Sequence, residues 1–244
     1  MKRLITKIYC QANLELAQVA EIIKVIEKHY PNVKLNKFIK GNDNEILIED
    51  VLDFASQAIC NKEIPMTYDD QNKLSIVLSG FFLDRVFYAN TPIWYILIKI
   101  HKNLPHCVAF DLLFDLSETL KAYWGTISPN NLEGFTQKLL SPEEKPFTPT
   151  FPRIMDPSSY SCPAIPARLG WINYWSSEAM EQIDPDRITD FSLLSPAKMS
   201  CSTNGSVIAQ LTPLPLDITK DEDLIVLSNW YNKLPKIGNM QQSN

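Results

Sequence analysis

Apolar and polar residues follow two different periods along this chain, which predicts a fold that mixes strands with helices. Segments that alternate or are continuously apolar are typical of strands, and they fall at residues 4–9, 33–39, 45–48, 73–78 and 93–100. Longer segments with apolar residues three and four positions apart predict amphipathic helices at residues 13–30, 51–59 and 104–124. Residues 65–72 are polar and are expected to form a loop, and residues 80–90 fit no single period.

Three aromatic rings dominate the start of the second half of the chain. Trp171, Tyr174 and Trp175 lie at positions i, i+3 and i+4, the spacing that places side chains on one face of a helix. This spacing predicts a helix over residues 171–183, which the Asp184-Pro185-Asp186 sequence ends. Each ring can bury roughly 150–250 Å², so we expect these rings to anchor a core.

Two strands and one helix are expected after this helix. One strand lies within residues 188–200 and the next at 207–211, joined through the Asn204-Gly205 turn. The last helix begins at Thr219, because Thr219 and Glu222 have the spacing of a capping box. Strands and helices in this order predict the α+β class, with mixed or antiparallel sheets and packed helices.

Prolines are concentrated between the two halves. Residues 141–166 hold seven of the 17 prolines, which rules out regular helix or a central strand and predicts a linker or an extended strap. We expect an N-terminal α+β lobe over residues 1–140 and a C-terminal α+β lobe over residues 167–244. Each lobe contains a strand, a Leu-Pro pair, a helix and an aromatic pair in that order. This order indicates either an internal duplication or a coincidence between two ordinary strand–helix units.

The composition fits a globular protein with a protein partner. The 244 residues are 45% hydrophobic and 21% charged, with a net charge of −5, which argues against disorder and against nucleic-acid binding. An acidic balance permits a basic partner, since opposite fields speed encounter. Five scattered cysteines without CxxC spacing, no secretory signal and no apolar run near 20 residues predict a cytoplasmic protein that does not bind membranes.

Candidate chemistry is sparse. The three histidines lack metal-ligand spacing with cysteines, and the seven glycines form no phosphate-binding loop, so we expect no metal and no cofactor. Asp111 and Asp115 lie one helical turn apart, and Cys107 follows His106. A small hydrolase that uses Asp111 or His106 is an alternative, but a solvated helix face explains the carboxylates more simply, and a surface or strand-end position explains the histidine.

Acidic residues form three clusters. The first comprises Asp43, Glu45, Glu49, Asp50 and Asp53. Because a negative surface could dock a basic protein, we predict partner contacts at Glu178, Glu181, Asp184, Asp186, Asp217, Asp221 and Asp223. Ordinary solvated surface is the alternative.

Aromatic anchors are expected among the charges at Trp94, Tyr95 or Tyr68. Other rings are expected in the core, namely Trp124, Trp171, Tyr174, Trp175, Trp230 and Tyr231.

Four short motifs carry a family resemblance. Residues 163–176 read PAIPARLGWINYWS, and they resemble a bacterial family with a proline-rich entry followed by L-G-W-[LI]-N-Y-W-S. Residues 122–129 (AYWGTISP) and 231–238 (YNKLPKIG) resemble two further motifs of that family. Residues 211–217 (LTPLPLD) resemble a fourth, with one residue more than the family spacing.

That family is similar to immunity protein family 52 of bacterial polymorphic toxin systems. The resemblance implies an α+β fold without enzymatic activity and a cognate secreted toxin as partner, often a nuclease delivered by machinery such as type VI secretion. It implies that the protein binds the toxin inside the producing cell and neutralises it by occlusion. The motif residues look structural, so the resemblance supplies no binding residues. An effector adaptor or chaperone is a further alternative.

Overall fold

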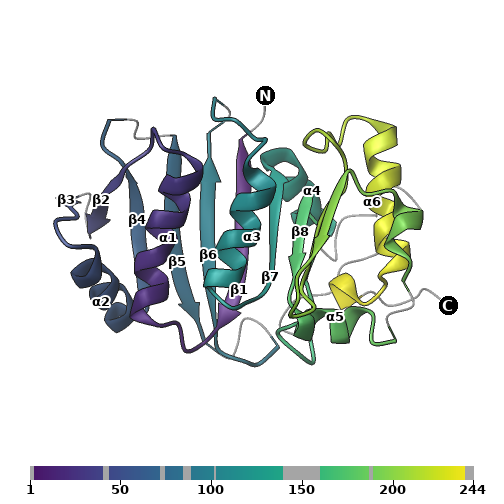
Figure 1. Ribbon diagram of the computed structural model, residues 1–244, viewed down its shortest axis with the longest axis horizontal. Helices are drawn as coiled ribbons and strands as arrows, with labels where there is room; N and C mark the ends of the chain where they lie inside the picture. The colour runs from purple at the N-terminus through teal and green to yellow at the C-terminus, as the bar shows by residue number, and fades with distance from the viewer. Residues whose placement is uncertain are drawn as a thin grey trace.

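The computed structural model describes residues 3–40, 44–71, 75–84, 89–101, 103–139, 160–186 and 189–239. Within these residues, ten strands form one antiparallel sheet in the order β3-β2-β4-β5-β6-β1-β7-β8-β10-β9 (Figure 1). The strands are β1 (Leu4–Gln11), β2 (Leu35–Lys40), β3 (Asn44–Leu47), β4 (Glu63–Asp69), β5 (Ile76–Leu83), β6 (Ile93–Ile100), β7 (Ala122–Pro129), β8 (Ile172–Trp175), β9 (Lys198–Cys201) and β10 (Val207–Gln210). The helices are α1 (Leu16–His29), α2 (Val51–Asn61), α3 (Ala109–Thr119), α4 (Asn130–Leu139), α5 (Ser177–Ile183) and α6 (Asp221–Lys233), with 3-10 turns η2 (Phe191–Leu194) and η3 (Ile237–Asn239). The fold is α+β, as predicted.

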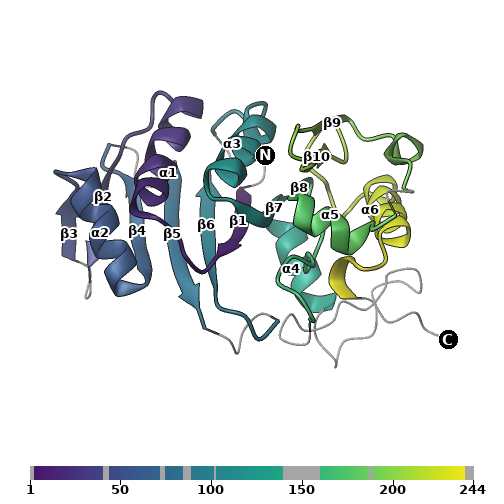
Figure 2. The ribbon, with the colours of Figure 1, turned by 60° about the horizontal axis from the view of Figure 1, so that its bottom comes forward.

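Helices cover the two faces of the sheet unequally. Helices α1, α2 and α3 lie over one face (Figure 1), and α4 lies on the opposite face against β1 and β7 (Figure 2). The central strand β1 is buried on both sides, because Ile8 and Cys10 face the α1–α3 layer while Lys7 reaches α4. The two halves of the chain share this sheet, since β7 pairs with β8.

A second core fills the space between the sheet and the C-terminal segments. Tyr9 stacks on Trp124 with centroids 4.1 Å apart, and Trp175 lies 6.2 Å from Trp230. All six rings expected in the core are buried, namely Trp124, Trp171, Tyr174, Trp175, Trp230 and Tyr231.

The helix predicted over residues 104–124 is wrong in its second half. Helix α3 ends at Thr119, and Lys121 takes a left-handed conformation with φ of 48° that reverses the chain. Strand β7 begins at Ala122, pairs with β1 and β8, and leads into α4, which the apolar pattern did not predict. The apolar spacing continues through Trp124 in either structure, so periodicity could not locate this break.

The helix predicted over residues 171–183 is also wrong at its start. Residues Ile172–Trp175 form β8, and the helix begins only after Ser176, whose Oγ accepts the Ala179 N–H at 3.1 Å. Neighbouring rings therefore project to opposite faces of a strand instead of sharing one helical face.

Two local predictions near chain turns are corrected. Residues 65–72 were expected to be a loop, but they overlap β4, where a register shift between Ile64 and Thr67 accommodates Pro65. The capping box at Thr219 does not form, because α6 begins after Lys220, which makes no side-chain cap. Thr219 instead donates to the Asp217 carboxylate.

Most other elements lie where the pattern predicted them. Strand β6 matches residue for residue, and the Asn204-Gly205 turn joins β9 to β10 with a Gly205 φ of 86°. The two units behind the duplication hypothesis end differently: Tyr123-Trp124 lies in a strand, whereas Trp230-Tyr231 lies in a helix. Most of the proline-rich segment 141–166 lies outside the described residues, so the prediction of a linker or strap there stays a prediction.

Candidate partner-binding surfaces

Helix α5 carries the first group of predicted partner residues. Glu178, Glu181 and Asp186 are exposed to solvent. Asp184 is buried, because it ends the helix and its carboxylate accepts the Thr189 N–H at 3.2 Å. The prediction of Asp184 as a surface contact is therefore corrected to a structural role.

The first turn of α6 carries the second group. Asp221 and Glu222 are exposed, and the exposed Ile225 follows one turn later on the same side of the helix. Asp223 is half-buried, and its carboxylate accepts the Asp217 N–H at 2.7 Å. Asp217 and Asp223 thus hold the loop that enters α6, which makes them poor candidates for partner contacts.

A groove runs beside this helix. Residues of η2 and α6 line a hollow of about 470 Å³, and its lining includes the exposed Leu193 and the buried Trp230. Leu193 is 71% exposed, and Leu214 in the preceding loop is 66% exposed. We call Leu193, Asp221, Glu222 and Ile225 the α6 surface. It combines acidic side chains with apolar ones, the composition of an interface centre with a charged rim.

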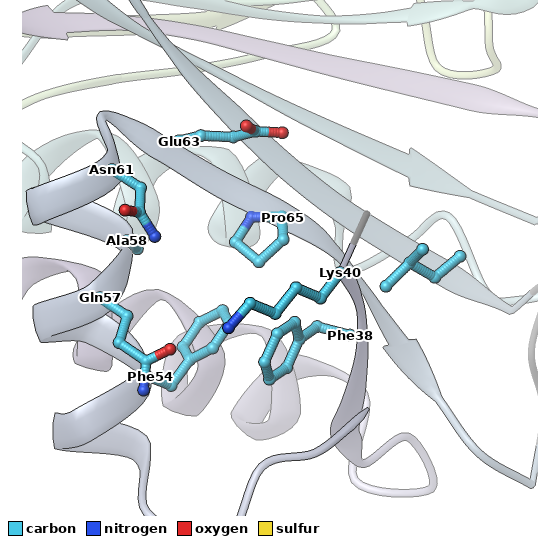
Figure 3. Close-up of a pocket in the computed structure, with 9 residues that line it drawn as sticks. Phe38, Lys40, Phe54, Gln57, Ala58, Asn61, Glu63 and Pro65 are labelled. Atoms are coloured by element: carbon cyan, nitrogen blue, oxygen red, sulfur yellow. The ribbon is translucent and has the colours of Figure 1, made fainter. Parts of the chain in front are cut away.

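A second hollow lies at the opposite end of the sheet, between α2 and strands β2 and β4 (Figure 3). Its volume is about 120 Å³, and the rings of Phe38 and Phe54 lie against each other with centroids 5.3 Å apart. Polar side chains surround these rings, namely Lys40, Gln57, Asn61 and Glu63. An apolar lining with a few polar groups at the rim suits an apolar side chain of a partner.

Acidic residues surround this end of the molecule as well. Asp50 caps α2 by accepting the Leu52 N–H at 2.8 Å, and Asp53 accepts from Gln57 at 2.8 Å. Glu49 is exposed and makes no ion pair among the described residues. Asp43, the remaining member of this acidic cluster, lies outside the described residues.

Exposed apolar side chains lie among these acids. Ile46, Leu47 and Leu52 are 36%, 51% and 56% exposed. We call residues 45–53 the β3–α2 surface. Two separate parts of the molecule therefore combine unburied carboxylates with unburied aliphatic groups.

The comparisons with known proteins identify the family. The model of the family described as "Domain of unknown function (DUF5953)" matches residues 15–242. The chain belongs to the DUF5953 family. Among solved structures, it is similar to the Pseudomonas aeruginosa T6SS protein PA0821, with a TM-score of 0.61 and 11% sequence identity. That match covers 97% of this chain and 77% of the other. At this identity the likeness shows a shared fold. A comparison with curated proteins gives no match.

Of the three aromatic anchors predicted for the DUF5953 chain, two are buried and the third is half-buried. Trp94 is 3% exposed and packs edge-on against Phe82, because its position in β6 faces the helical layer. Tyr68 is also buried. Tyr95 is half-buried and lies 5.1 Å from Tyr9. The exposed apolar groups of this protein are therefore aliphatic at both surfaces described above.

The sequence analysis missed a buried charge cluster behind the sheet. The Glu133 carboxylate of α4 accepts hydrogen bonds from Lys7 of β1 and from Arg168, the latter at 3.2 Å. Burial lowers the pKa of Lys7, and the neighbouring Arg168 lowers it further. A signal was present in Arg168 itself, a lone charge within the apolar run of the PARLGWINYW motif.

A polar pocket lies at the end of α3 in the DUF5953 chain. The Glu118 carboxylate accepts from Tyr174 Oη at 2.8 Å, Ser206 Oγ at 2.7 Å and Asn204 Nδ2 at 3.1 Å. The pocket has a volume of about 210 Å³ and also includes Glu178. Burial and the Glu118 carboxylate both raise the pKa of Tyr174. A carboxylate with three donors is well suited to fix the β9–β10 hairpin in place.

The residues of the hydrolase alternative lie elsewhere. Asp111 is exposed and pairs with Lys198 at 3.0 Å, and the His106 ring lies 6.1 Å from that of Trp171. Neither residue lines the Glu118 pocket. Among the described residues, no group of three metal-binding side chains comes together. Nor does any described helix have the length and apolar character to span a membrane.

Proposed function

We propose that this chain is an immunity protein that binds a cognate secreted toxin and neutralises it by covering its active face. The observation that carries the proposal is the pairing of exposed carboxylates with exposed aliphatic side chains at the α6 surface and the β3–α2 surface. The fold shared with a T6SS protein and the motifs that resemble immunity protein family 52 support it.

The two kinds of side chain have different physical roles in such a complex. Carboxylates attract a basic partner and raise the association rate, chiefly at low salt. Leu193, Leu47 and Leu52 lose water-accessible apolar area on binding, which stabilises the complex at roughly 25 cal/mol per Å² before ordering costs. A nuclease presents a basic face to its substrate, so an acidic surface fits there and excludes the nucleic acid.

The test is bacterial survival during expression of the toxin encoded beside this gene, with and without this protein. Protection together with co-purification supports neutralisation. Toxicity that persists while the two proteins still co-purify would indicate an adaptor or chaperone and contradict the proposal.

Charge reversal tests the surfaces. Asp221→Lys with Glu222→Lys, or Glu49→Lys with Asp53→Lys, should slow association and reduce protection for at least one pair. Glu178→Lys with Glu181→Lys tests the acidic pair of α5, which the sequence also predicts as a partner contact. It should have the smallest effect, because α5 exposes two acids without a large exposed apolar residue. Equal binding by all three variants would contradict the assignment of the surfaces.

A further inference from the structure

Strand β3 lies at one edge of the ten-stranded sheet. Among the described strands its only neighbour is β2, and all four of its residues are exposed. The Ile48 N–H donates to the Asn36 carbonyl of β2 at 2.7 Å. Since backbone groups alternate in direction along an antiparallel strand, the N–H and C=O of Leu47 point away from β2. This edge can therefore pair with a further strand.

Natural sheets usually protect such an edge with lysine, proline or a covering segment. Residues 44–61 contain no lysine, arginine or proline, whereas they contain Glu45, Glu49, Asp50 and Asp53. Ile46 and Leu47 on the strand and Leu52 on α2 remain exposed. The edge thus keeps its pairing capacity and carries four negative charges around it.

These charges decide which strand can pair there. A second copy of this chain would bring its own acidic residues close to these four, and at Glu45, which lies in the strand itself, a like charge directly opposite is destabilising. A basic strand would instead place lysine or arginine near them. Lys37 of β2 already compensates part of this charge, because it lies 3.7 Å from Glu45 and 2.7 Å from Asp70.

The hollow of Figure 3 adjoins the same edge. Lys40, which lines it, pairs in β2 with Asn44, the first residue of β3. The rings of Phe38 and Phe54 offer an apolar site next to the strand. An apolar residue that flanks the docked strand can be anchored there, while main-chain hydrogen bonds fix the register.

We infer that β3 binds a basic, extended segment of a partner protein by strand addition, with the exposed acids of residues 45–53 selecting for positive charge. This inference rests on the proposed function only in taking that partner to be the toxin.

The binding test uses an octapeptide of alternating lysine and valine, with a glutamate–valine peptide as its control. At a concentration about ten times its Kd, the basic peptide should slow amide hydrogen exchange at Leu47 about tenfold. The Ile46 amide, which points to β2, should change far less. The acidic peptide should protect neither. Absence of protection at Leu47 would overturn the inference.

Two substitutions separate the backbone from the side chain. Leu47→Pro removes the outward N–H without touching the bonds to β2 and should abolish binding, whereas Leu47→Ala keeps the N–H and should bind more weakly but measurably. Glu49→Lys should lower the affinity for the basic peptide about tenfold, and Glu181→Lys on α5 should leave it unchanged. Circular dichroism verifies that each variant is folded.

The toxin complex tests the identity of the partner. Protection of the Leu47 amide in that complex supports strand addition by the toxin. If the toxin binds and Leu47 exchanges as before, the inference is overturned while the proposed function stands. If the toxin does not bind at all, the proposed function fails, and the peptide experiment still decides whether β3 accepts a basic strand.

Discussion

Arg168 donates a hydrogen bond from Nη1 to Oε2 of Glu133 at 3.2 Å, and both side chains are buried behind the sheet. Lys7 bonds to the same oxygen, so one carboxylate faces two cations. Arg168 belongs to the segment that precedes β8, whereas Glu133 lies on α4 and Lys7 on β1. These three side chains therefore connect three segments that are distant in sequence.

Removal of the Glu133 charge should destabilise the fold strongly. Glu133→Gln leaves Arg168 and Lys7 buried without a counter-charge, and breaking a buried ion pair costs about 3–5 kcal/mol. Urea unfolding monitored by tryptophan fluorescence measures the change. Glu181→Gln on the exposed face of α5 is the control and should change stability by less than about 0.5 kcal/mol. Equal stability of the two variants would show that the cluster is not important for folding.

Replacement of Lys7, unlike removal of the Glu133 charge, should not lower the stability of the fold. The folded-state pKa of Lys7 lies below its usual 10.5, chiefly because of burial. The unfolded chain therefore binds more protons between these two pKa values, and the Lys7 contribution to stability rises as the pH increases toward 10.5. Lys7→Met leaves one cation for one carboxylate and should be neutral or stabilising at pH 7.

The pH dependence isolates this effect. Buried tyrosines such as Tyr9 have raised pKa values and make the fold less stable at high pH. They are present in both the native chain and the Lys7→Met variant, so their effect cancels in the comparison. The stability advantage of Lys7→Met over the native chain should shrink as the pH rises toward 10.5. An advantage that is constant with pH would contradict the assignment to Lys7 ionisation.

Local patterns determined part of this fold because some segments allow one structure only. The eight-residue apolar run 93–100 is too short and too β-branched for a helix, and it is β6. The segments 104–124 and 171–183 were ambiguous, since their aromatic spacing suits a helix and their strands are stabilised by distant partners. Strand β7 pairs with β1, more than 110 residues earlier in the sequence. Such pairing is not visible in any local window.

The candidate surfaces were predictable in charge but not in exposure. Asp221 and Asp223 are equivalent in sequence terms, yet one is exposed and the other holds a loop N–H. Trp94 resembled a surface anchor only while the layer over β6 was unknown. The β3–α2 surface was recognised as acidic, but its position at one edge of the sheet follows from the strand order.

The LGWINYW motif should tolerate no side chain at its glycine. A Cβ on Gly170 would lie 2.7 Å from Ser128 Oγ and 2.8 Å from the Ile127 carbonyl oxygen, because the chain crosses directly over β7. Gly170→Ala should therefore lower the unfolding free energy by about 1–3 kcal/mol. Gly134→Ala is the matched control: nothing lies within 4 Å of its Cβ, and alanine in this exposed helix position should stabilise by about 0.5–1 kcal/mol. Thermal unfolding measures both effects. Midpoints that shift in the same direction for Gly170→Ala and Gly134→Ala would contradict the argument.

The β9–β10 hairpin should depend on Glu118. Its carboxylate accepts from Ser206 and Asn204 of the hairpin and from Tyr174 of β8, which fixes the hairpin to the end of α3. Glu118→Gln keeps the shape but replaces an acceptor oxygen with a donor, so at least one of these groups loses its partner at a cost of about 1–3 kcal/mol. Amide hydrogen exchange at residues 207–210 should become faster while exchange in β6 stays slow, because the loss is local. Glu178→Gln, an exposed residue of the same pocket, should leave both regions unchanged. Uniformly faster exchange across the whole sheet would instead place Glu118 in the global core and contradict a local role.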